Sequence, residues 1–181
     1  MITWNQDKYI KAWNFASLVH NGQQVPGTEI PYINHIGLVA MEAMTAIAQS
    51  DEISSPDLLV LCAMLHDTIE DTGSSFEDIS SEFGIKIANG VMALSKDKKL
   101  STKKQQMADS LQRIKKQPKE VWMVKLSDRI TNLQPPPKHW DKAKITSYKN
   151  EAITILNVLG VSNKYLAERL RFKIDEYQKY E

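Results

Sequence analysis

Four residues that can bind a metal ion or move protons follow directly on an uninterrupted apolar run. The run covers residues 58–65, and after it come His66, Asp67, Glu70 and Asp71. Buried charge is costly unless it is paired or bound to a metal ion, so a core segment has little physical reason to end in this way. The sequence therefore predicts a reactive site at the end of a buried helix.

His35 and Asp128 are the other candidates for a metal site, because each lies in a segment that also carries regularly spaced apolar residues. Folding of those segments would bring both side chains toward His66 and Asp67. Two imidazoles and two carboxylates suit a divalent ion such as Mn²⁺, Fe²⁺ or Zn²⁺ and suit Ca²⁺ less well. A single histidine on a helix is more often a surface or core residue, so the prediction depends on all four residues together.

The acidic pair Glu70–Asp71 would lie one helical turn beyond His66 and Asp67 if the helix continues through it. A carboxylate there can orient, deprotonate or protonate a water molecule on the ion. The alternative is a pair that only ends a helix in solvent. Acidic side chains are unfavourable at a helix C-terminus, where the dipole is negative, so a cation is expected nearby.

The segment around Asp128 places polar residues on one helical face. Lys125, Asp128 and Asn132 are three and four residues apart, so Asn132 would point to the same side as Asp128 and could contact a substrate. The alternative is a solvated polar stripe. In the basic segment 95–104 we expect most lysines to be solvated and one or two to hold phosphate.

Composition indicates an ordinary globular chain. Of its 181 residues, 42% are hydrophobic and 25% charged, and the net charge of +1 gives no general attraction to nucleic acid or membrane. The single cysteine, Cys62, suits a reducing compartment and excludes an intrachain disulfide framework. No segment reaches the roughly 20 apolar residues of a membrane span, and no leader pattern opens the chain, so we expect a cytoplasmic protein.

Helical periodicity runs along the chain, and no stretch alternates long enough to form a sheet. We expect capping boxes at residues 3–6 and 74–77, a proline-initiated helix after Ser55, a long helix from about Trp140 to Leu159 and a last helix capped by Ser162. The prediction is one all-α domain over residues 1–181, a bundle of about eight to ten helices with its core over about 5–160. The last helix, about 162–180, could pack on the domain or pair two chains in a homodimer.

An ordered set of short motifs resembles the hydrolase domain of the RelA/SpoT homologues, a branch of the HD-domain phosphohydrolases, and in particular their small stand-alone alarmone hydrolases. The motifs are Phe15-Ala16, His20-x-Gly22-Gln23, Pro31-Tyr32-Ile33-Asn34-His35, Leu65 to Thr72, Phe83-Gly84, Ser95-Lys96-Asp97-Lys98 and Val124 to Leu133. An HD pair alone is a weak signal. The ordered set with the acidic pair in place is a specific one.

The resemblance implies one Mn²⁺ per chain, bound by His35, His66, Asp67 and Asp128, with Glu70 and Asp71 as the pair that activates the attacking water. It also implies a small-molecule nucleotide substrate that is contacted by Lys98, Asn132, Lys144 and Tyr148. The expected reaction removes the 3′-pyrophosphate of guanosine tetra- or pentaphosphate and returns GDP or GTP. The chain length leaves no room for a synthetase domain, so we expect hydrolysis alone.

One segment departs from the family pattern. Between Gly22-Gln23 and Pro31-Tyr32 the family usually carries a basic pair that faces the substrate's phosphates, whereas residues 24–30 carry no positive charge. Charge-assisted hydrogen bonds are among the stronger contacts, so the loss predicts weaker binding or a changed specificity unless Lys11, Lys125 or the basic turn compensates. A 3′-pyrophosphorylated adenosine nucleotide or another phosphorylated nucleotide therefore stays open as the substrate.

Two other functional classes also stay open on the sequence. A general HD nucleotidase or phosphodiesterase with two metal ions would need further histidines, and only His20 and His139 remain. A nucleotide-binding sensor with a degenerate site would bind without turnover. The presence of every proposed ligand and of the acidic pair favours the hydrolase.

Overall fold

The computed structural model describes residues 5–50 and 53–181, and over these residues the protein is built from helices. They form ten α-helices and two short 3₁₀ segments, and the only pairing of extended backbone among them is an isolated bridge between Gln24 and Pro31. The predicted all-α fold is confirmed. Thr3, the expected cap of the first helix, lies outside the described residues. Within them Asn5 takes that role, because its side chain accepts a hydrogen bond from the Lys8 backbone N–H.

Three helices form the centre of the fold and pack against one another: α2 (Ile33–Ala48), α3 (Pro56–Leu65) and α8 (Lys119–Asn132). Residues 58–65 of α3 are all buried, so this helix has no face toward solvent along that stretch. A helix that is apolar all round must be enclosed by other elements. The apolar run that stands out in the sequence is therefore the inner helix of the bundle.

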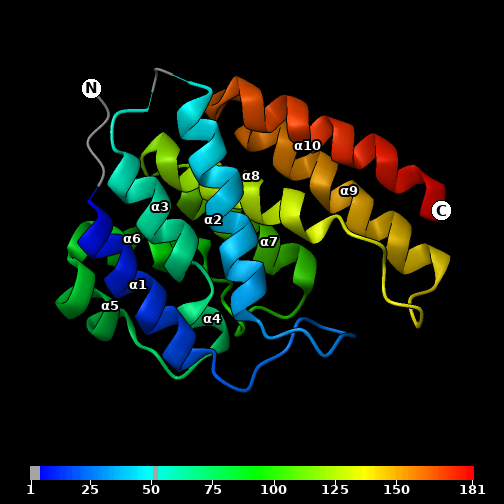
Figure 1. Cartoon of the computed structure of the whole chain (residues 1–181). Coiled ribbons are helices and arrows are strands. Elements are labelled where there is room, and N and C mark those ends of the chain that lie inside the picture. Colours follow the sequence, from blue (N-terminus) through cyan, green and yellow to red (C-terminus); the bar gives the residue numbers. More distant parts are fainter. Residues whose placement is uncertain (1–4, 51–52) are drawn as a thin grey trace.

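The remaining helices cover this centre from two sides (Figure 1). On one side lie α1 (Gln6–Val19), α5 (Phe76–Phe83) and α6 (Ile85–Leu94), with α7 (Lys103–Ile114) against α6. On the other side lie α9 (Lys142–Leu159) and α10 (Lys164–Tyr177). One hydrophobic core joins both sides, with Ala12, Ile79 and Ile155 among its fully enclosed members.

The helix at the centre stops earlier than its sequence predicts. We expected one helix through residue 71, but α3 ends at Leu65 and a separate single turn, α4 (Thr68–Asp71), follows. Thr68 Oγ1 donates to the Leu65 carbonyl at 2.7 Å and so competes for an acceptor of the last turn of α3. His66 and Asp67 lie in the break between the two helices.

Three other helix starts differ from the prediction by one or two residues. The second capping box uses Ser75 and Asp78, because the Ser74 hydroxyl already accepts a hydrogen bond from Thr72 Oγ1. The last helix is capped by Asn163 in place of Ser162, because residues 160–162 form a 3₁₀ turn. The helix expected from Trp140 begins at Lys142 behind the cap Asp141. Local hydrogen bonds of this kind shift boundaries without changing which helices form.

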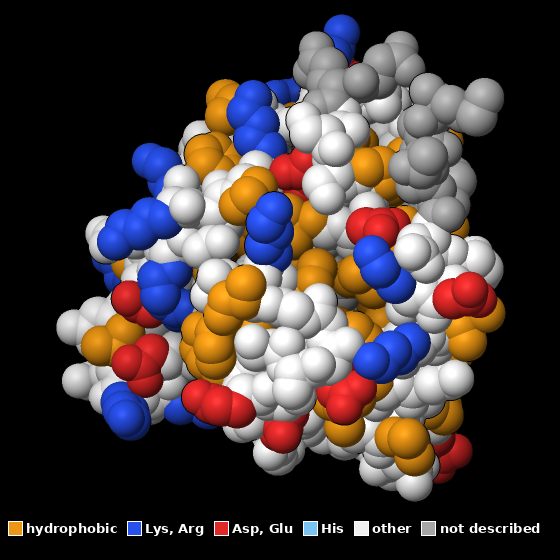
Figure 2. Space-filling view, turned by 90° about the vertical axis from the view of Figure 1, so that its left-hand side faces the viewer, with side chains coloured by type: hydrophobic (Ala, Val, Ile, Leu, Met, Phe, Trp, Pro, Cys, Tyr) orange, Lys and Arg blue, Asp and Glu red, His pale blue; other side chains and the backbone are white. Residues whose placement is uncertain are grey.

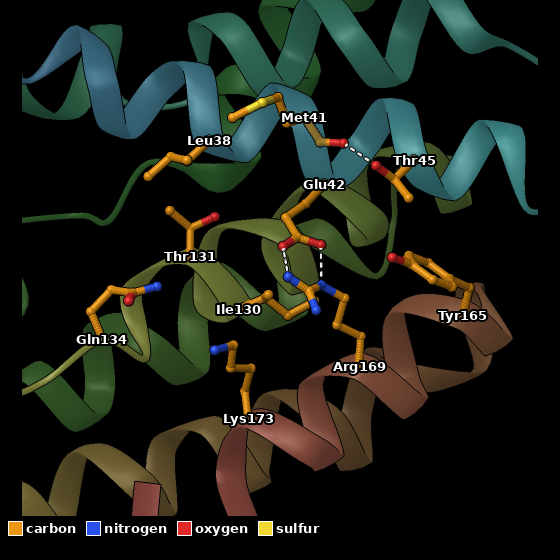
Figure 3. A pocket seen from close by; sticks show the side chains of 10 residues that line it. All are labelled: Leu38, Met41, Glu42, Thr45, Ile130, Thr131, Gln134, Tyr165, Arg169 and Lys173. Carbon is orange, nitrogen blue, oxygen red and sulfur yellow. Dashed lines mark hydrogen bonds and ion pairs between the residues drawn. The ribbon is translucent and has the colours of Figure 1, made fainter. Parts of the chain in front are cut away.

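The C-terminal helix packs on the domain, which is one of the two arrangements expected from the sequence. Leu166, Leu170 and Ile174 of α10 are buried, and α10 contacts both α8 and α9. Figure 3 shows Arg169 of α10 facing Glu42 of α2 across a hollow whose floor includes Ile130 and Thr131 of α8. Arg169 Nε and Nη2 donate to the two oxygens of Glu42, both at 2.5 Å. This paired contact fastens α10 to the central helices.

The surface carries charges of both signs. On the face shown in Figure 2, lysine and arginine side chains alternate with aspartate and glutamate, and hydrophobic side chains form small separate groups. This agrees with the net charge of +1. Within the described part of the chain, no helix combines the length and apolar character that a bilayer crossing would require.

Gly90 marks a close approach of α6 to α3 and α8. A Cβ atom at Gly90 would lie 2.6 Å from Cys62 Sγ and 3.1 Å from Val121 Cγ2. Alanine gains about 1 kcal/mol of helix propensity over glycine, but forcing a methyl group into a packed core costs about 1–3 kcal/mol and more in tight sites. We therefore expect Gly90→Ala to lower the free energy of unfolding by about 1 kcal/mol or more, measured by urea denaturation.

Urea denaturation of further variants tests whether the contact between the new methyl group and Cys62 causes the loss of stability. Gly73→Ala is the control, because a Cβ there meets nothing within 4 Å. Adding Cys62→Ala to Gly90→Ala removes the sulfur atom that the new methyl group meets, so the double variant should lose less stability than the sum of the single losses. Strictly additive losses would contradict the proposed close contact.

Candidate functional site

A cleft of about 500 Å³ opens where the start of α2, the turn α4 and the second half of α8 meet. This volume lies in the range of small-molecule sites. α7 and α9 contribute its outer walls. Eight of the predicted site residues line the cleft: Asp67, Glu70, Asp71, Lys98, Asp128, Asn132, Lys144 and Tyr148. Folding thus brings to one place residues that are up to 81 positions apart, from Asp67 to Tyr148.

Three of the predicted metal ligands gather at the inner end of the cleft. His35, His66 and Asp128 each offer one ligand atom, and these atoms all lie within 4.8 Å of one another. All three residues are buried. His66 Nδ1–H donates to the Ala63 carbonyl at 2.8 Å, which orients the ring so that Nε2 faces the cluster.

This cluster fits a divalent metal ion by its own geometry. The Nε2 atoms of His35 and His66 are buried and make no hydrogen bond of good angular geometry, although Asp67 Oδ2 lies 2.9 Å from His66 Nε2. Buried polar atoms in proteins are almost always satisfied, so two orphaned imidazole nitrogens beside a carboxylate point to a missing common partner. Imidazole and carboxylate together are a donor set for transition-metal dications.

Asp67, the fourth predicted ligand, lies beside the three-residue cluster. Its Oδ2 is 2.9 Å from His66 Nε2 and 3.6 Å from His35 Nε2. The Tyr32 hydroxyl donates to the same oxygen at 2.6 Å and holds the carboxylate in place. Burial alone would raise the pKa of Asp67, but the adjacent His66 and His35 rings outweigh it and keep that pKa well below its usual value.

Asp128 is held from two sides by its own helix. Lys125 Nζ donates to Asp128 Oδ2 at 2.8 Å, and the Asn132 amide donates to Oδ1. The expected common face of Lys125, Asp128 and Asn132 is therefore present, and all three residues line the cleft. Burial would raise the pKa of Asp128, but Lys125 and the nearby imidazoles hold it below its usual value. Asp128 is thus a carboxylate.

The two acidic residues of α4 differ in their surroundings. The Glu70 carboxylate accepts from the Lys96 backbone N–H at 2.7 Å and from Lys96 Nζ at 3.1 Å. Asp71 has only Lys98 Nζ at 3.3 Å beside its Oδ1. Burial, with the charges of Asp67 and Glu70, raises the pKa of Asp71. Glu70 is therefore held by two hydrogen bonds, whereas Asp71 is the more weakly held carboxylate.

Lysine side chains near α4 supply the positive charge that an acidic pair at a helix C-terminus is expected to need. An acidic pair at a helix end was expected to need a nearby positive charge. Lys96 supplies that charge to Glu70, and Lys98 supplies it to Asp71 while its Nζ also donates to the Glu70 carbonyl at 2.5 Å. Protein side chains thus balance the pair even without an ion.

Aromatic and basic side chains form the wall opposite the acidic pair. The Arg129 guanidinium carbon lies 4.2 Å from the centre of the Tyr148 ring, and Lys144 Nζ lies 5.1 Å from the centre of the Trp140 ring. Trp140 and Tyr148 pack edge to face at 5.1 Å. Lys144 and Tyr148 share α9 as expected. A planar base or a sugar could rest against such a wall.

Sequence reasoning missed four residues of the site, Tyr32, Lys96, Arg129 and Trp140, and misplaced one. Tyr32, Lys96 and Arg129 stood inside recognised motifs, but their roles depend on contacts with Asp67, Glu70 and Tyr148 that no spacing reveals. Of the cations suggested to replace the missing basic pair, Lys125 and members of the basic turn line the cleft. Lys11 does not, because it pairs with Glu82 at 2.9 Å over the Phe83 ring.

The fold and the site together define the class of this protein. The model of the family described as HD domain matches residues 12–162, and the chain belongs to this family. The His66–Asp67 pair after which the family is named lies at the inner end of the cleft, together with His35 and Asp128.

Within the family the chain is similar to small alarmone hydrolases over nearly its whole length. It is 30% identical over 166 residues to guanosine-3′,5′-bis(diphosphate) 3′-pyrophosphohydrolase MESH1 of Danio rerio, which covers 87% of each chain. The protein of the same name from Xenopus tropicalis is 32% identical over 171 residues, with 89% of each chain covered. A solved structure described as a metazoan ortholog of SpoT that hydrolyzes ppGpp has a TM-score of 0.83 at 25% identity and covers 97% of this chain and 98% of its own. The family resemblance inferred from the motifs is confirmed.

The cluster makes metal binding a prediction that can be measured without any substrate. A ligand that binds only the folded state stabilises it by about 2.7 kcal/mol at a concentration of one hundred times its dissociation constant. We therefore expect Mn²⁺ to raise the thermal unfolding midpoint relative to EDTA buffer, and His66→Ala to abolish the increase. His139→Ala is the matched control, since His139 is exposed and outside the cluster. An equal increase in all three proteins would argue against the cluster as the metal site.

Proposed function

We propose that this protein hydrolyses the 3′-pyrophosphate of guanosine 3′,5′-bis(diphosphate)-type alarmones, releasing pyrophosphate and returning GDP or GTP. The observation that carries the proposal is the meeting, in one cleft, of a histidine–aspartate cluster, an acidic pair and a basic, aromatic wall. The first two parts supply what hydrolysis of a phosphate ester requires, and the third suits a nucleotide. The relatives that carry this activity in their names support the choice of substrate.

The metal ligands in this proposal are His35, His66, Asp67 and Asp128, and the ion is one Mn²⁺ per chain. When bound, such an ion acts as a Lewis acid on a phosphoryl group and makes a water molecule more acidic. Tyr32 and Lys125 are the residues that orient the two carboxylates, because they donate to Asp67 and Asp128. Partners of this kind fix ligand orientation and are nearly as important for affinity as the ligands.

Glu70 and Asp71 divide the acid–base work between them. Asp71 takes the proton from the attacking water, since its carboxylate has the weaker partners and a raised pKa that brings it closer to the operating range of a general base. Glu70, held at both oxygens by Lys96, orients that water. Water attacks the phosphorus that carries the 3′ oxygen, the bond to that oxygen breaks, and the freed 3′ oxygen takes up the proton that Asp71 accepted from the water.

The rest of the substrate extends along the outer wall of the cleft. Tyr148 and Trp140 offer ring faces to the nucleoside, and Lys144 offers a charge to the 5′-diphosphate. Asn132 has one amide hydrogen engaged with Asp128 and keeps further polar capacity for a sugar hydroxyl or a phosphate oxygen. Lys98, at the mouth of the cleft, serves a phosphate group.

The proposal is tested with a panel of nucleotides in Mn²⁺ buffer. We expect release of pyrophosphate, and no orthophosphate, from guanosine tetraphosphate, with the adenosine analogue and guanosine 3′-monophosphate as alternative substrates in parallel. Asp71→Asn keeps the shape of the side chain but removes the base, so kcat should fall by about 10²–10⁴-fold. Mass spectrometry or a coupled pyrophosphate assay reads the products.

The control for this experiment is Asp97→Asn, which changes an acidic residue of the nearby basic turn that does not line the cleft. It should retain activity close to that of the unchanged protein. Orthophosphate as the product, or equal turnover by the unchanged protein and Asp71→Asn, would rule out the proposed reaction.

The surroundings of Asp71 also predict a pH effect. A base must be ionised, so kcat/KM falls as the pH drops through the pKa of Asp71. Lys98 lowers that pKa, since its positive charge favours the carboxylate, and Lys98→Met removes this effect. The acidic limb of the pH–rate profile should therefore move to higher pH, in addition to any loss of affinity. Lys99→Met, at an exposed neighbouring lysine, should leave the limb unmoved; a shift in the opposite direction would show that Asp71 is not the base.

A further inference from the structure

Arg129 is a buried cation with unused hydrogen-bond donors. Only 4% of the residue is exposed, and it lines the cleft. Its Nη2 donates to Glu151 Oε2 at 3.2 Å. Its Nε and Nη1 are buried and have no partner.

An arrangement of this kind is costly for the folded protein alone. A buried charge must be paired, and its remaining hydrogens must be bonded, or the loss of hydration outweighs the attraction. One contact to Glu151 leaves most of the five N–H donors of the guanidinium without acceptors. A bound acceptor with several oxygens would remove this deficit.

Arg129 lines the same cleft as Asp67 and Asp128 of the histidine–aspartate cluster. It follows Asp128 directly in α8, and its guanidinium stacks on the Tyr148 ring at 4.2 Å. Burial raises the pKa of Tyr148, and the charges of Arg129, Asp128 and Lys96 all act on its hydroxyl. Arg129, Asp128 and Lys96 are therefore all close to the Tyr148 hydroxyl. The part of the substrate that is hydrolysed, its 3′-diphosphate, has to lie beside the histidine–aspartate cluster that contains Asp128.

The cations nearest the acidic residues of the cleft are already paired with carboxylates. Lys125 is bound to Asp128, Lys96 to Glu70 and Lys98 to Asp71. Residues 24–30, which would carry a basic pair in the family pattern, contain no positive charge and do not line the cleft. A guanidinium with open donors on the opposite wall is thus the group with the most capacity for an oxyanion.

We propose that Arg129 is the residue that binds the 3′-diphosphate of the substrate, with Glu151 and Tyr148 as the residues that position its guanidinium. The arginine supplies from α8 the phosphate contact that residues 24–30 lack. Guanidinium suits this role better than an ammonium group, because its planar fork matches two phosphate oxygens at once. The proposal rests on the proposed function for the name of the substrate, but its phosphate chemistry can be tested separately.

The test is calorimetric titration of two probes, inorganic pyrophosphate and GDP, in EDTA buffer and again with Mn²⁺. Pyrophosphate represents the group released from the 3′ position, and GDP represents the rest of the nucleotide. We expect Arg129→Met to weaken pyrophosphate binding by about tenfold or more and GDP binding by less than about threefold, as loss of a charge-assisted contact predicts. Arg129→Lys keeps the charge with a single amine and should recover part of the loss.

The same substitution at an exposed arginine is the matched control. Arg171→Met, in α10 and outside the cleft, should bind both probes like the unchanged protein. Equal weakening of both probes by Arg129→Met would mean a merely structural role, and a loss confined to GDP would place Arg129 at the 5′-diphosphate. Either outcome overturns the proposal, as does unchanged pyrophosphate binding. If Arg129→Met does not fold by circular dichroism, Arg129→Lys and Glu151→Gln give the same comparison.

Failure of the proposed function would give a different set of results from failure of the role proposed for Arg129. In that case the unchanged protein would release no pyrophosphate from guanosine tetraphosphate, yet its binding of inorganic pyrophosphate could still depend on Arg129. Conversely, the unchanged protein could hydrolyse guanosine tetraphosphate while the Arg129 variants keep full affinity for pyrophosphate. That result would contradict only the role proposed for Arg129. The two results are therefore independent.

Discussion

The enclosure of α3 by α2 and α8 is the constraint on which the rest of the structure depends. These helices carry His66, His35 and Asp128 at or near the ends that meet, so packing of their apolar faces fixes three polar atoms within 4.8 Å of one another. Such rigidity comes from a core at close-packed density and not from the polar groups themselves, which would separate in water. The apolar residues next to the site are thus as much a part of its function as the histidines.

Around that frame the cleft is organised by charge pairs that differ in strength. Asp128 has a buried lysine at 2.8 Å, Glu70 has two bonds from Lys96, and Asp71 has one exposed lysine. This gradient from inside to outside keeps Asp128 ionised and leaves Asp71 able to exchange a proton. An environment that pushes neighbouring carboxylates apart in pKa is how one site assigns them different tasks.

The helices, their order and the predicted members of the cleft could be read from the sequence, because apolar periodicity and motif order are local signals. The sequence could not indicate that α3 stops at Leu65, because the hydrogen bond from the Thr68 hydroxyl to the Leu65 carbonyl forms only in the folded backbone. Nor could they assign Lys96 to Glu70 or Arg129 to Tyr148, because those contacts join segments 26 and 19 residues apart. Lys11 was misjudged for the same reason: its partner, Glu82, lies on another helix.

α8 has almost no free surface, since every residue from 123 to 131 is buried. Its apolar side faces the core, and its polar side faces the cleft. Adding or removing one residue would turn everything beyond that point by about 100°, so the helix has no neutral way to change length. In evolutionary terms, such a helix is frozen, and new substrate preferences have to arise in the parts of the cleft outside it, such as residues 95–103 and α9.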